Sequence, residues 1–317
     1  MTGYLTEPNG RVWQLPPLLE WHVTHTDGDP CGAFTVRFPA DPAQPGTAGR
    51  ALGFQARENG AAVFTGVVDE AMTVLSADGF LTELTGRDLA AKLLDNQVRA
   101  AEFQTAQLQD ILAAYVRPYG VSRINADAMA AVPAFAVDTG STCWQALAGF
   151  CRHAADIRPR FLADGTLELR KLPAAATRQL TDFSGALSLS LRECRYGVAS
   201  QVTEVDTAHG RAATAKNDGF LAEGGCAARV VAASGSTLRA GWRTPAQRLC
   251  DSARDRRILT AVLPGGFAAW PRDRVAVSLT RPGIRGNYTV RAAETILDED
   301  GLRTVVTMRG DCGNVAV

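Results

Sequence analysis

Alternating hydrophobic and polar positions dominate both ends of the chain. Such runs flank Asn-Gly or Asp-Gly pairs at residues 59–60, 78–79 and 300–301. After the last pair, an apolar residue or threonine stands at every second position from Leu302 to Met308. Because successive side chains of a strand point to opposite faces, this period of two is typical of a half-buried strand. Asn-Gly and Asp-Gly favour the positive φ angles of tight hairpin turns. The pattern therefore predicts antiparallel sheet near both ends of the chain.

A helical period replaces the alternation in the middle of the chain. Apolar residues recur at i, i+3, i+4, i+7 and i+8 between Leu108 and Val116, which predicts a helix with one buried face. Pro118 and Gly120 are expected to end it. A shorter helix is predicted from Asp88 to Asp95, with its apolar residues on one face.

Two further helices are indicated by their first residues. Thr142 is followed three residues later by Gln145, the spacing of a capping box. Thr244 is an expected N-cap because Pro245 occupies the first helical position and Gln247 the third.

These patterns predict an α+β fold that is mainly β, with two antiparallel barrel-like domains flanking a helical middle segment. The expected division is residues 1–87, 88–182 and 183–317. The middle domain should include one hairpin at Asp164-Gly165, and the last domain should contain the helix at Thr244. Residues 208–236 are rich in Ala and Gly and lack a clear period, so they are predicted to be a long loop or insertion.

The charge balance argues against nucleic acid and membrane partners. Lys+Arg and Asp+Glu are both 33, so the net charge is zero. Duplex-binding proteins and membrane-surface segments normally carry a basic excess. The chain has no apolar run of about 18 residues, and Met1 to Trp21 lacks the pattern of a secretory leader. We expect no specific nucleic acid, no membrane insertion and no cleaved leader. The seven cysteines are scattered and odd in number, which favours reduced thiols.

Cys143, Cys151 and His153 are the first candidates for chemistry, either as metal ligands or as a Cys/His nucleophile pair. Zinc sites usually contain short paired spacings such as C-x2-C, and the gap between these cysteines is too long. Cys151 also falls in the apolar stripe of its helix. We therefore interpret both cysteines as core residues.

His22 and His25 could bind a metal with Asp27 and Asp29 as further ligands. The alternative is a pair of partly exposed histidines on a strand or turn, which we favour.

Clustered charges offer further candidates. Asp69-Glu70 and Asp298 to Asp300 could supply the two carboxylates of a glycosidase, but the second group is better explained as a solvated hairpin tip. The basic run Arg254 to Arg257 could be a nucleic-acid patch, but we favour a helix end, where cations complement the helix dipole. No G-x-S-x-G, HExxH, P-loop or GxGxxG motif occurs. We predict no catalytic, cofactor-binding or metal-binding residues, and no enzyme.

The order of short motifs resembles the contractile phage and tailocin baseplate hub family, known as late control D or Mu-type tail hub proteins. The N-terminal motifs are Val63–Val68 ("VFTGVV") and Thr85–Asp88 ("TGRD"). The C-terminal motifs are Thr244–Gln247, Leu263–Gly265, Trp270–Val277 and Gly286–Val290, followed by a hairpin at Gly301–Thr304. The family often has Gly where this chain has Arg272.

The resemblance implies a structural hub subunit, in a homotrimer, that joins the six-fold tail tube to the three-fold central spike and leaves a channel. Its implied partners are the tail spike protein, the tail tube or tube-initiator protein, and the tape measure protein. Its implied locations are the virion tail baseplate and, during assembly, the host cytoplasm. We further expect the two β segments to form similar separate barrels that alternate around a ring of three chains, with edges meeting between chains. The alternatives are a tail-tip or spike-associated protein and a tail-associated peptidoglycan hydrolase.

Overall fold

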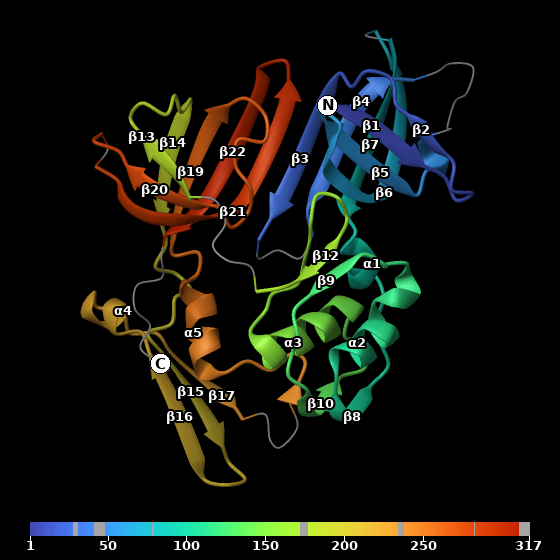
Figure 1. Ribbon diagram of the computed structural model, residues 1–317. Helices are drawn as coiled ribbons and strands as arrows, with labels where there is room; N and C mark the ends of the chain where they lie inside the picture. Colours follow the sequence, from blue (N-terminus) through green and yellow to red (C-terminus); the bar gives the residue numbers. More distant parts are fainter. Residues whose placement is uncertain are drawn as a thin grey trace.

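Two β units lie side by side in the computed structural model, with a mixed helical and β region beneath them (Figure 1). The structure describes residues 1–27, 31–40, 48–77, 79–171, 177–233, 238–281 and 283–310. Strands outnumber helices throughout, which confirms the mainly β prediction.

The first β unit is an antiparallel sheet in the order β3-β4-β7-β6-β5-β1-β2. Its strands are β1 (Thr2–Thr6), β2 (Val12–Gln14), β3 (Glu20–Thr26), β4 (Ala33–Pro39), β5 (Gly53–Glu58), β6 (Ala61–Ser76) and β7 (Gly79–Asp88), with a 3-10 turn η1 at Ala48–Arg50. The hairpin predicted at Asn59-Gly60 joins β5 to β6. Phe34, Phe54 and Phe64 are buried in its core, and the rings of Phe34 and Phe54 stack 4.2 Å apart.

The second β unit contains strands in the order β14-β19-β22-β21. β21 also pairs with β20, and β20 pairs with β13. Its strands are β13 (Thr177–Thr181), β14 (Ser188–Glu193), β19 (Arg257–Pro264), β20 (Arg274–Ser278), β21 (Arg285–Asp298) and β22 (Gly301–Gly310). The predicted Asp300-Gly301 turn joins β21 to β22. β13 lies in the segment predicted as the middle domain, but it pairs with β20 and so is part of this unit.

The middle unit lies beneath the first β unit and combines helices with short strands. It contains α1 (Ala91–Leu94), β8 (Ala101–Ala106), α2 (Leu108–Tyr115), η2 (Arg117–Tyr119), β9 (Ile124–Ala126), β10 (Val132–Val137), α3 (Cys143–Ala155), β11 (Arg160–Phe161) and β12 (Leu167–Leu169). Gly120 ends η2 in a left-handed conformation, and Thr142 and Gln145 form the predicted capping box. The helix predicted over residues 88–95 is shorter, because Asp88 still pairs within β7.

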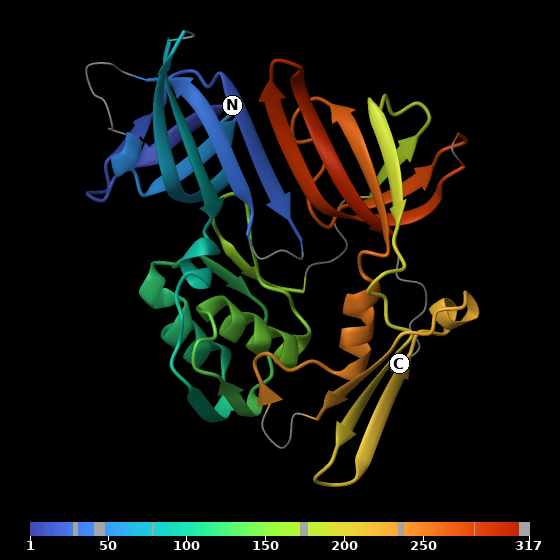
Figure 2. The same ribbon diagram turned by 180° about the vertical axis from the view of Figure 1, so that it is seen from behind.

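Residues 201–253 form an inserted unit beneath the second β unit (Figure 2). It contains β15 (Gln201–Asp206), β16 (Arg211–Lys216), α4 (Asp218–Ala222), β17 (Ala228–Ala232), β18 (Leu238–Arg239) and α5 (Pro245–Ala253). The expected N-cap Thr244 accepts a hydrogen bond from the amide of Gln247. β15, β16 and β17 form their own sheet, so of the two alternatives predicted for 208–236 the structure contradicts the long loop and agrees with the insertion. β18 pairs with β10 and ties the insertion to the middle unit.

One antiparallel strand pair joins the two β units. Six residues of β21, from Ala292 to Leu297, pair with six residues of β3, from Trp21 to Thr26. We call this pairing the seam. It merges both units into a single sheet of 13 strands, and the strand pairs of the described residues close no barrel. The expectation of two separate barrels is therefore wrong, because each unit covers the edge of the other within one chain.

Candidate functional site: the junction of the units

The seam is buried on one side and carries a hydrogen-bonded His–Glu pair on the other. Trp21, Val23 and Thr295 are at most 5% exposed on the inner side. On the outer side, His22 Nε2 lies 3.2 Å from Glu294 Oε2. This hydrogen bond lowers the pKa of Glu294. The seam therefore combines a main-chain ladder with side-chain contacts on both faces.

An aromatic cluster reinforces the seam from inside. We give this name to Trp21, His25 and Phe64 of the first β unit together with Phe267 and Trp270 of the second. Trp21 and Phe267 stack at 5.8 Å, Phe267 and Trp270 at 5.7 Å, and His25 meets Trp270 edge-on at 4.8 Å. Such ring pairs stabilise an interface by about 0.5–1.5 kcal/mol each beyond their burial.

The backbone of Phe267 is strained in this cluster. Its φ is +52°, a left-handed value that is unusual for a bulky side chain. This conformation persists because the ring is held between Trp21 and Trp270 and the Phe267 amide donates to Thr295 Oγ1 at 3.3 Å. The connection between β19 and β20 is thus fixed onto the first β unit.

His25 is the titratable member of the aromatic cluster. Burial lowers its pKa to about 4, against the smaller opposing effect of its hydrogen bond with Val63. The ring is therefore neutral near pH 7, and Nε2–H donates to the Val63 carbonyl oxygen at 2.8 Å. His22 and His25 lie on β3 and are both partly exposed, as predicted.

The TGRD motif lies where β7 leaves the first β unit. Gly86 has no room for a side chain, because a Cβ would lie 2.0 Å from the Val67 carbonyl oxygen and 2.5 Å from the Phe34 ring. Arg87 donates two hydrogen bonds to Asp69 and two to Asp95, all between 2.7 and 2.9 Å. Arg87 thereby holds Asp69 and Asp95 in ion pairs on one guanidinium group.

Asp88 connects three chain segments through one carboxylate. It accepts the amide of Gly32 at 2.6 Å and the amide of Ala90 at 2.8 Å, and the Cys31 thiol donates to it at 3.2 Å. Burial raises the pKa of Asp88 despite these bonds. The carboxylate at the end of β7 thus binds two other segments, the residues before β4 and the turn that leads into α1. These bonds fix the middle unit to the first β unit.

The Trp-Pro-Arg-Asp turn contains a non-glycine residue in a left-handed conformation. Arg272 has a φ of +75°, a value that glycine adopts without steric cost. The next residue, Asp273, is 4% exposed and accepts from the Trp270 amide at 3.1 Å and from Arg178 Nε at 2.5 Å. The turn therefore positions Trp270 for the aromatic cluster and binds β13 to the start of β20.

The middle unit matches a known domain family. Residues 90–171 match the family model described as the second domain of the gp44-like baseplate hub protein. The match begins two residues after Asp88 and ends two residues after β12, so it coincides with the middle unit. No curated protein sequence matches the chain significantly.

Solved structures share the fold of nearly the whole chain. A tail protein of Neisseria meningitidis MC58 has a TM-score of 0.74 at 17% identity, covering 98% of this chain and 96% of that one. The 43 kDa tail protein of prophage MuSo2 from Shewanella oneidensis has a TM-score of 0.76 at 16% identity, covering 97% of each chain. The resemblance to baseplate hub proteins is confirmed.

A component of a bacterial secretion system also shares the fold. A component of the type VI secretion system of Escherichia coli has a TM-score of 0.55 at 11% identity, covering 95% of this chain and 76% of that one. It is described as structurally similar to the bacteriophage T4 tail proteins gp27 and gp5.

Within this hub-type fold, Cys143 and Cys151 are core residues of α3, as predicted. Both are fully buried, and burial raises the pKa of Cys151 to about 12. His153 stacks on Trp242 at 5.9 Å, and its Nε2 lies 3.1 Å from the Arg239 carbonyl oxygen. The three residues therefore serve packing and the contact between α3 and the insertion.

The remaining charged candidates form ion pairs within the chain. Asp298 accepts two hydrogen bonds from Arg303 beside the β21–β22 turn, which confirms the hairpin-tip interpretation. In the basic run, Arg254, Arg256 and Arg257 pair with Asp251, Glu223 and Glu193 respectively. Asp29 lies outside the described residues.

Neither a metal cluster nor a spanning helix occurs in the described part of the chain. Across its seven ranges, no group of three His, Cys, Asp or Glu residues could hold a metal ion. None of the helices described is long and apolar enough to cross a membrane.

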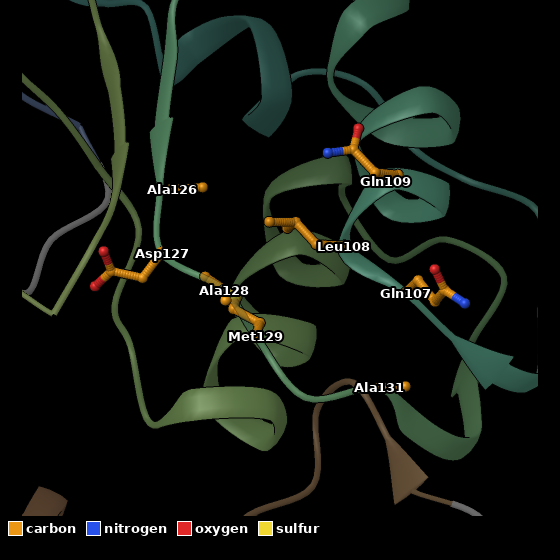
Figure 3. Close-up of a pocket in the computed structure, with 8 residues that line it drawn as sticks. All are labelled: Gln107, Leu108, Gln109, Ala126, Asp127, Ala128, Met129 and Ala131. Atoms are coloured by element: carbon orange, nitrogen blue, oxygen red, sulfur yellow. The ribbon is translucent and has the colours of Figure 1, made fainter.

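A shallow depression of about 420 Å³ lies beside the first turn of α2. Its lining is Gln107, Leu108, Gln109, Ala126, Asp127, Ala128, Met129 and Ala131 (Figure 3). The Asp127 side chain points away from the two glutamines and accepts the Lys171 amide at 2.9 Å. The lining groups do not converge on one point, as a catalytic pocket would require.

Proposed function

We propose that the chain is a structural baseplate hub subunit of a contractile phage-type tail, which joins the six-fold tail tube to the three-fold central spike and leaves a channel. The observation that carries this proposal is the match of residues 90–171 to a baseplate hub domain within a chain that has the fold of prophage tail proteins. The proposed role is mechanical and not enzymatic.

The contacts between the units support a mechanical role. The seam and the aromatic cluster join the two β units, and Asp88 joins the first β unit to the middle unit. Main-chain ladders and buried aromatic contacts resist relative motion better than exposed ion pairs do. A subunit built in this way transmits force between its two faces.

We propose that three copies form a homotrimer on the three-fold spike. The proposed partners are the tail spike protein, the tail tube or tube-initiator protein and the tape measure protein, and the proposed place is the virion tail baseplate after assembly in the host cytoplasm. β2, β13 and β14 each lie at an end of the main sheet, so each offers an edge for subunit contact. Because the two β units share one sheet, independent barrels alternating around a ring are not part of this proposal.

We further propose that the chain is divided into three domains, and that the domain to which a strand belongs is set by the strands with which it pairs. The first boundary, predicted at residue 87, then follows the end of β7 at Asp88. The second, predicted at residue 182, moves to before β13, because β13 pairs with the second β unit. The inserted unit at residues 201–253 is an addition to the second β unit.

A tail-tip or spike-associated protein is the second candidate, because a type VI secretion component shares the fold. The test is cryo-electron microscopy of tail particles that carry a tagged copy of the chain. Three copies between the last tube ring and the spike are expected. Six copies, a position along the tube, or a position outside the tube axis would contradict the hub role.

A peptidoglycan hydrolase is the least favoured candidate, and a turbidity assay tests it separately. Purified chain is expected to leave peptidoglycan intact. Cleavage that is lost on substitution of Cys143, Cys151 or His153 would overturn the structural role.

A further inference from the structure

The second half of β6 is an open strand edge. β5 pairs with β6 from Ala61 to Val67, whereas β7 pairs with it from Gly66 to Ser76. From Glu70 onward, β6 therefore has a neighbouring strand on one side only, as far as the strand pairs of the described residues extend. Its main-chain N–H and C=O groups on the other side are available to a further strand.

The side chains along this edge are exposed and uncharged. The four successive residues Met72 to Leu75 are all exposed, and Leu75 is 78% exposed. A strand lying on the body of a sheet would bury every second residue, so this part of β6 is uncovered on both faces. Open edges are usually protected by charged side chains or proline. Neither occurs from Ala71 to Leu75, so this segment has the composition of an edge that is covered by a partner.

β14 is a second open edge and belongs to the other β unit. It pairs with β19 and ends the strand order of the main sheet. Leu187, directly before it, is 65% exposed, and Arg192 within it is also exposed. β14 and the β6–β7 hairpin lie on opposite sides of the molecule (Figure 1). The two edges therefore do not face each other within one chain, but each can face a second copy.

The two edges complement each other in one antiparallel register. If Arg192 of one copy lies opposite Glu70 of the next, then the exposed Leu187 lies opposite the exposed Leu75. Neither Arg192 nor Glu70 has a side-chain partner among the residues that the structure describes. Opposite charges and apolar pairs directly across a ladder are both stabilising. A parallel arrangement of the same segments would instead set each charge beside a leucine.

This register also keeps the buried faces of the two strands in agreement. Residues directly opposite each other in an antiparallel pair lie on the same face of the sheet. Leu189 and Leu191 pack against the core of the second β unit, and Ala71 packs against the core of the first. Since the register sets Leu191 opposite Ala71, the core-facing side of one chain continues into that of the next. A slip of one residue would turn the core-facing residues of one strand toward the outer side of the other.

We propose that β14 of one copy of the chain pairs with the open half of β6 in the next copy, in this register. Because the two edges differ, the contact is head-to-tail, and three such contacts close a ring. The inference rests on the proposed homotrimer and names the strands that join its subunits. The main sheet of each chain then continues into that of its neighbour.

The test is disulfide cross-linking, both of the purified full chain at high concentration and of tail particles that carry it. The register sets Ser190 opposite Met72, with both side chains exposed and near enough for a disulfide. Met72→Cys/Ser190→Cys is expected to give a covalent trimer after mild oxidation, whereas each single variant should not. Met72→Cys/Val230→Cys is the matched control, because Val230 is a strand residue of the inserted unit that is 72% exposed. This control should give no trimer.

Charge reversal in the Met72→Cys/Ser190→Cys chain tests the register. Arg192→Glu and Glu70→Arg should each slow cross-linking about two- to fivefold, as expected when an exposed ion pair is lost. The double reversal should restore the rate, because it recreates an opposite pair. Leu75→Glu should prevent cross-linking, and Val230→Glu should not affect it.

The results separate this inference from the hub role. Three copies per particle on the tail axis without a covalent trimer would overturn the strand contact and leave the hub role intact. A covalent trimer together with six copies, or with an off-axis position, would support the contact and contradict the hub role. Equal cross-linking by the control pair, or no recovery in the double reversal, would also overturn the proposed contact.

Discussion

Arg272 occupies a backbone conformation that glycine adopts far more readily than arginine does. Its φ of +75° should cost about 1 kcal/mol relative to glycine. Arg272→Gly is therefore expected to raise the free energy of unfolding by about 1 kcal/mol, measured by chemical denaturation. Arg272→Ala removes the same side chain but keeps the strained φ, so it should give no comparable gain. Equal effects of the two substitutions would mean that backbone strain is not the cause.

His25 makes stability depend on pH through its lowered pKa of about 4. The unfolded chain takes up a proton near the usual pKa of about 6.5, whereas the folded chain does so only near 4. Between these values the unfolded state binds more protons, so stability falls as the pH falls. We expect a loss of up to about 2 kcal/mol between pH 7.5 and pH 5.

Removing the imidazole tests this prediction directly. His25→Gln should flatten the dependence in that pH range. An unchanged slope in His25→Gln would assign the effect to other groups.

Single residues were only partly predictable from the sequence. The core roles of Cys143 and Cys151 followed from the helical stripe, because burial there depends on local spacing. The role of His25 did not, since its neighbours Phe267 and Trp270 are more than 240 residues away in the chain. Asp88 was named as part of a motif, but its three partners come from folding and not from spacing.

At the scale of elements, α2 depends on one buried face. Leu112 is 2% exposed in the core of the middle unit. Leu112→Asp would bury an unpaired carboxylate at a cost of several kcal/mol, which is comparable with the net stability of a domain. We expect loss of soluble expression or assembly. Ala113→Asp places the same charge on the exposed side of α2 and should express normally.

Elements with local signals were predicted well. The hairpin at Asn59-Gly60 and the helix starts at Thr142 and Thr244 depend on neighbouring residues only, and all three are present. β16 and β17 were missed because their short alanine side chains are mostly exposed, which leaves no apolar period to detect. The middle unit was predicted to be mainly helical because its strands are short.

At the scale of the whole molecule, Phe267 should control how firmly the β units are joined. Phe267→Ala removes two ring stacks from the aromatic cluster and is expected to cost about 2 kcal/mol. Amide hydrogen exchange should then speed up in Trp21–Thr26 and Ala292–Leu297. Phe183→Ala, at a position 95% exposed, is the matched control and should leave exchange unchanged. Unchanged exchange in Phe267→Ala would show that the seam does not need the cluster.

Long-range pairing was the part of the fold that the sequence could not supply. Strand periodicity identifies β3 and β21 but does not say that they are partners, because any edge strand with a matching buried face could pair. Because of this ambiguity, the strand edges of the two β units were expected to pair between neighbouring chains, whereas β3 and β21 pair within one chain. The seam is thus a property of the complete chain and not of either β unit.

The seam also fixes when the protein can finish folding. A ribosome releases the strand ending at Thr26 long before it synthesises Ala292, so that edge of the nascent chain waits unpaired through most of translation. Closing a loop of this length makes the native contacts highly non-local, which slows folding. A prematurely terminated product would keep an open edge and be prone to aggregation. Only chains that extend through Leu297 can therefore complete the seam, which ties the closure of this edge to the synthesis of β21.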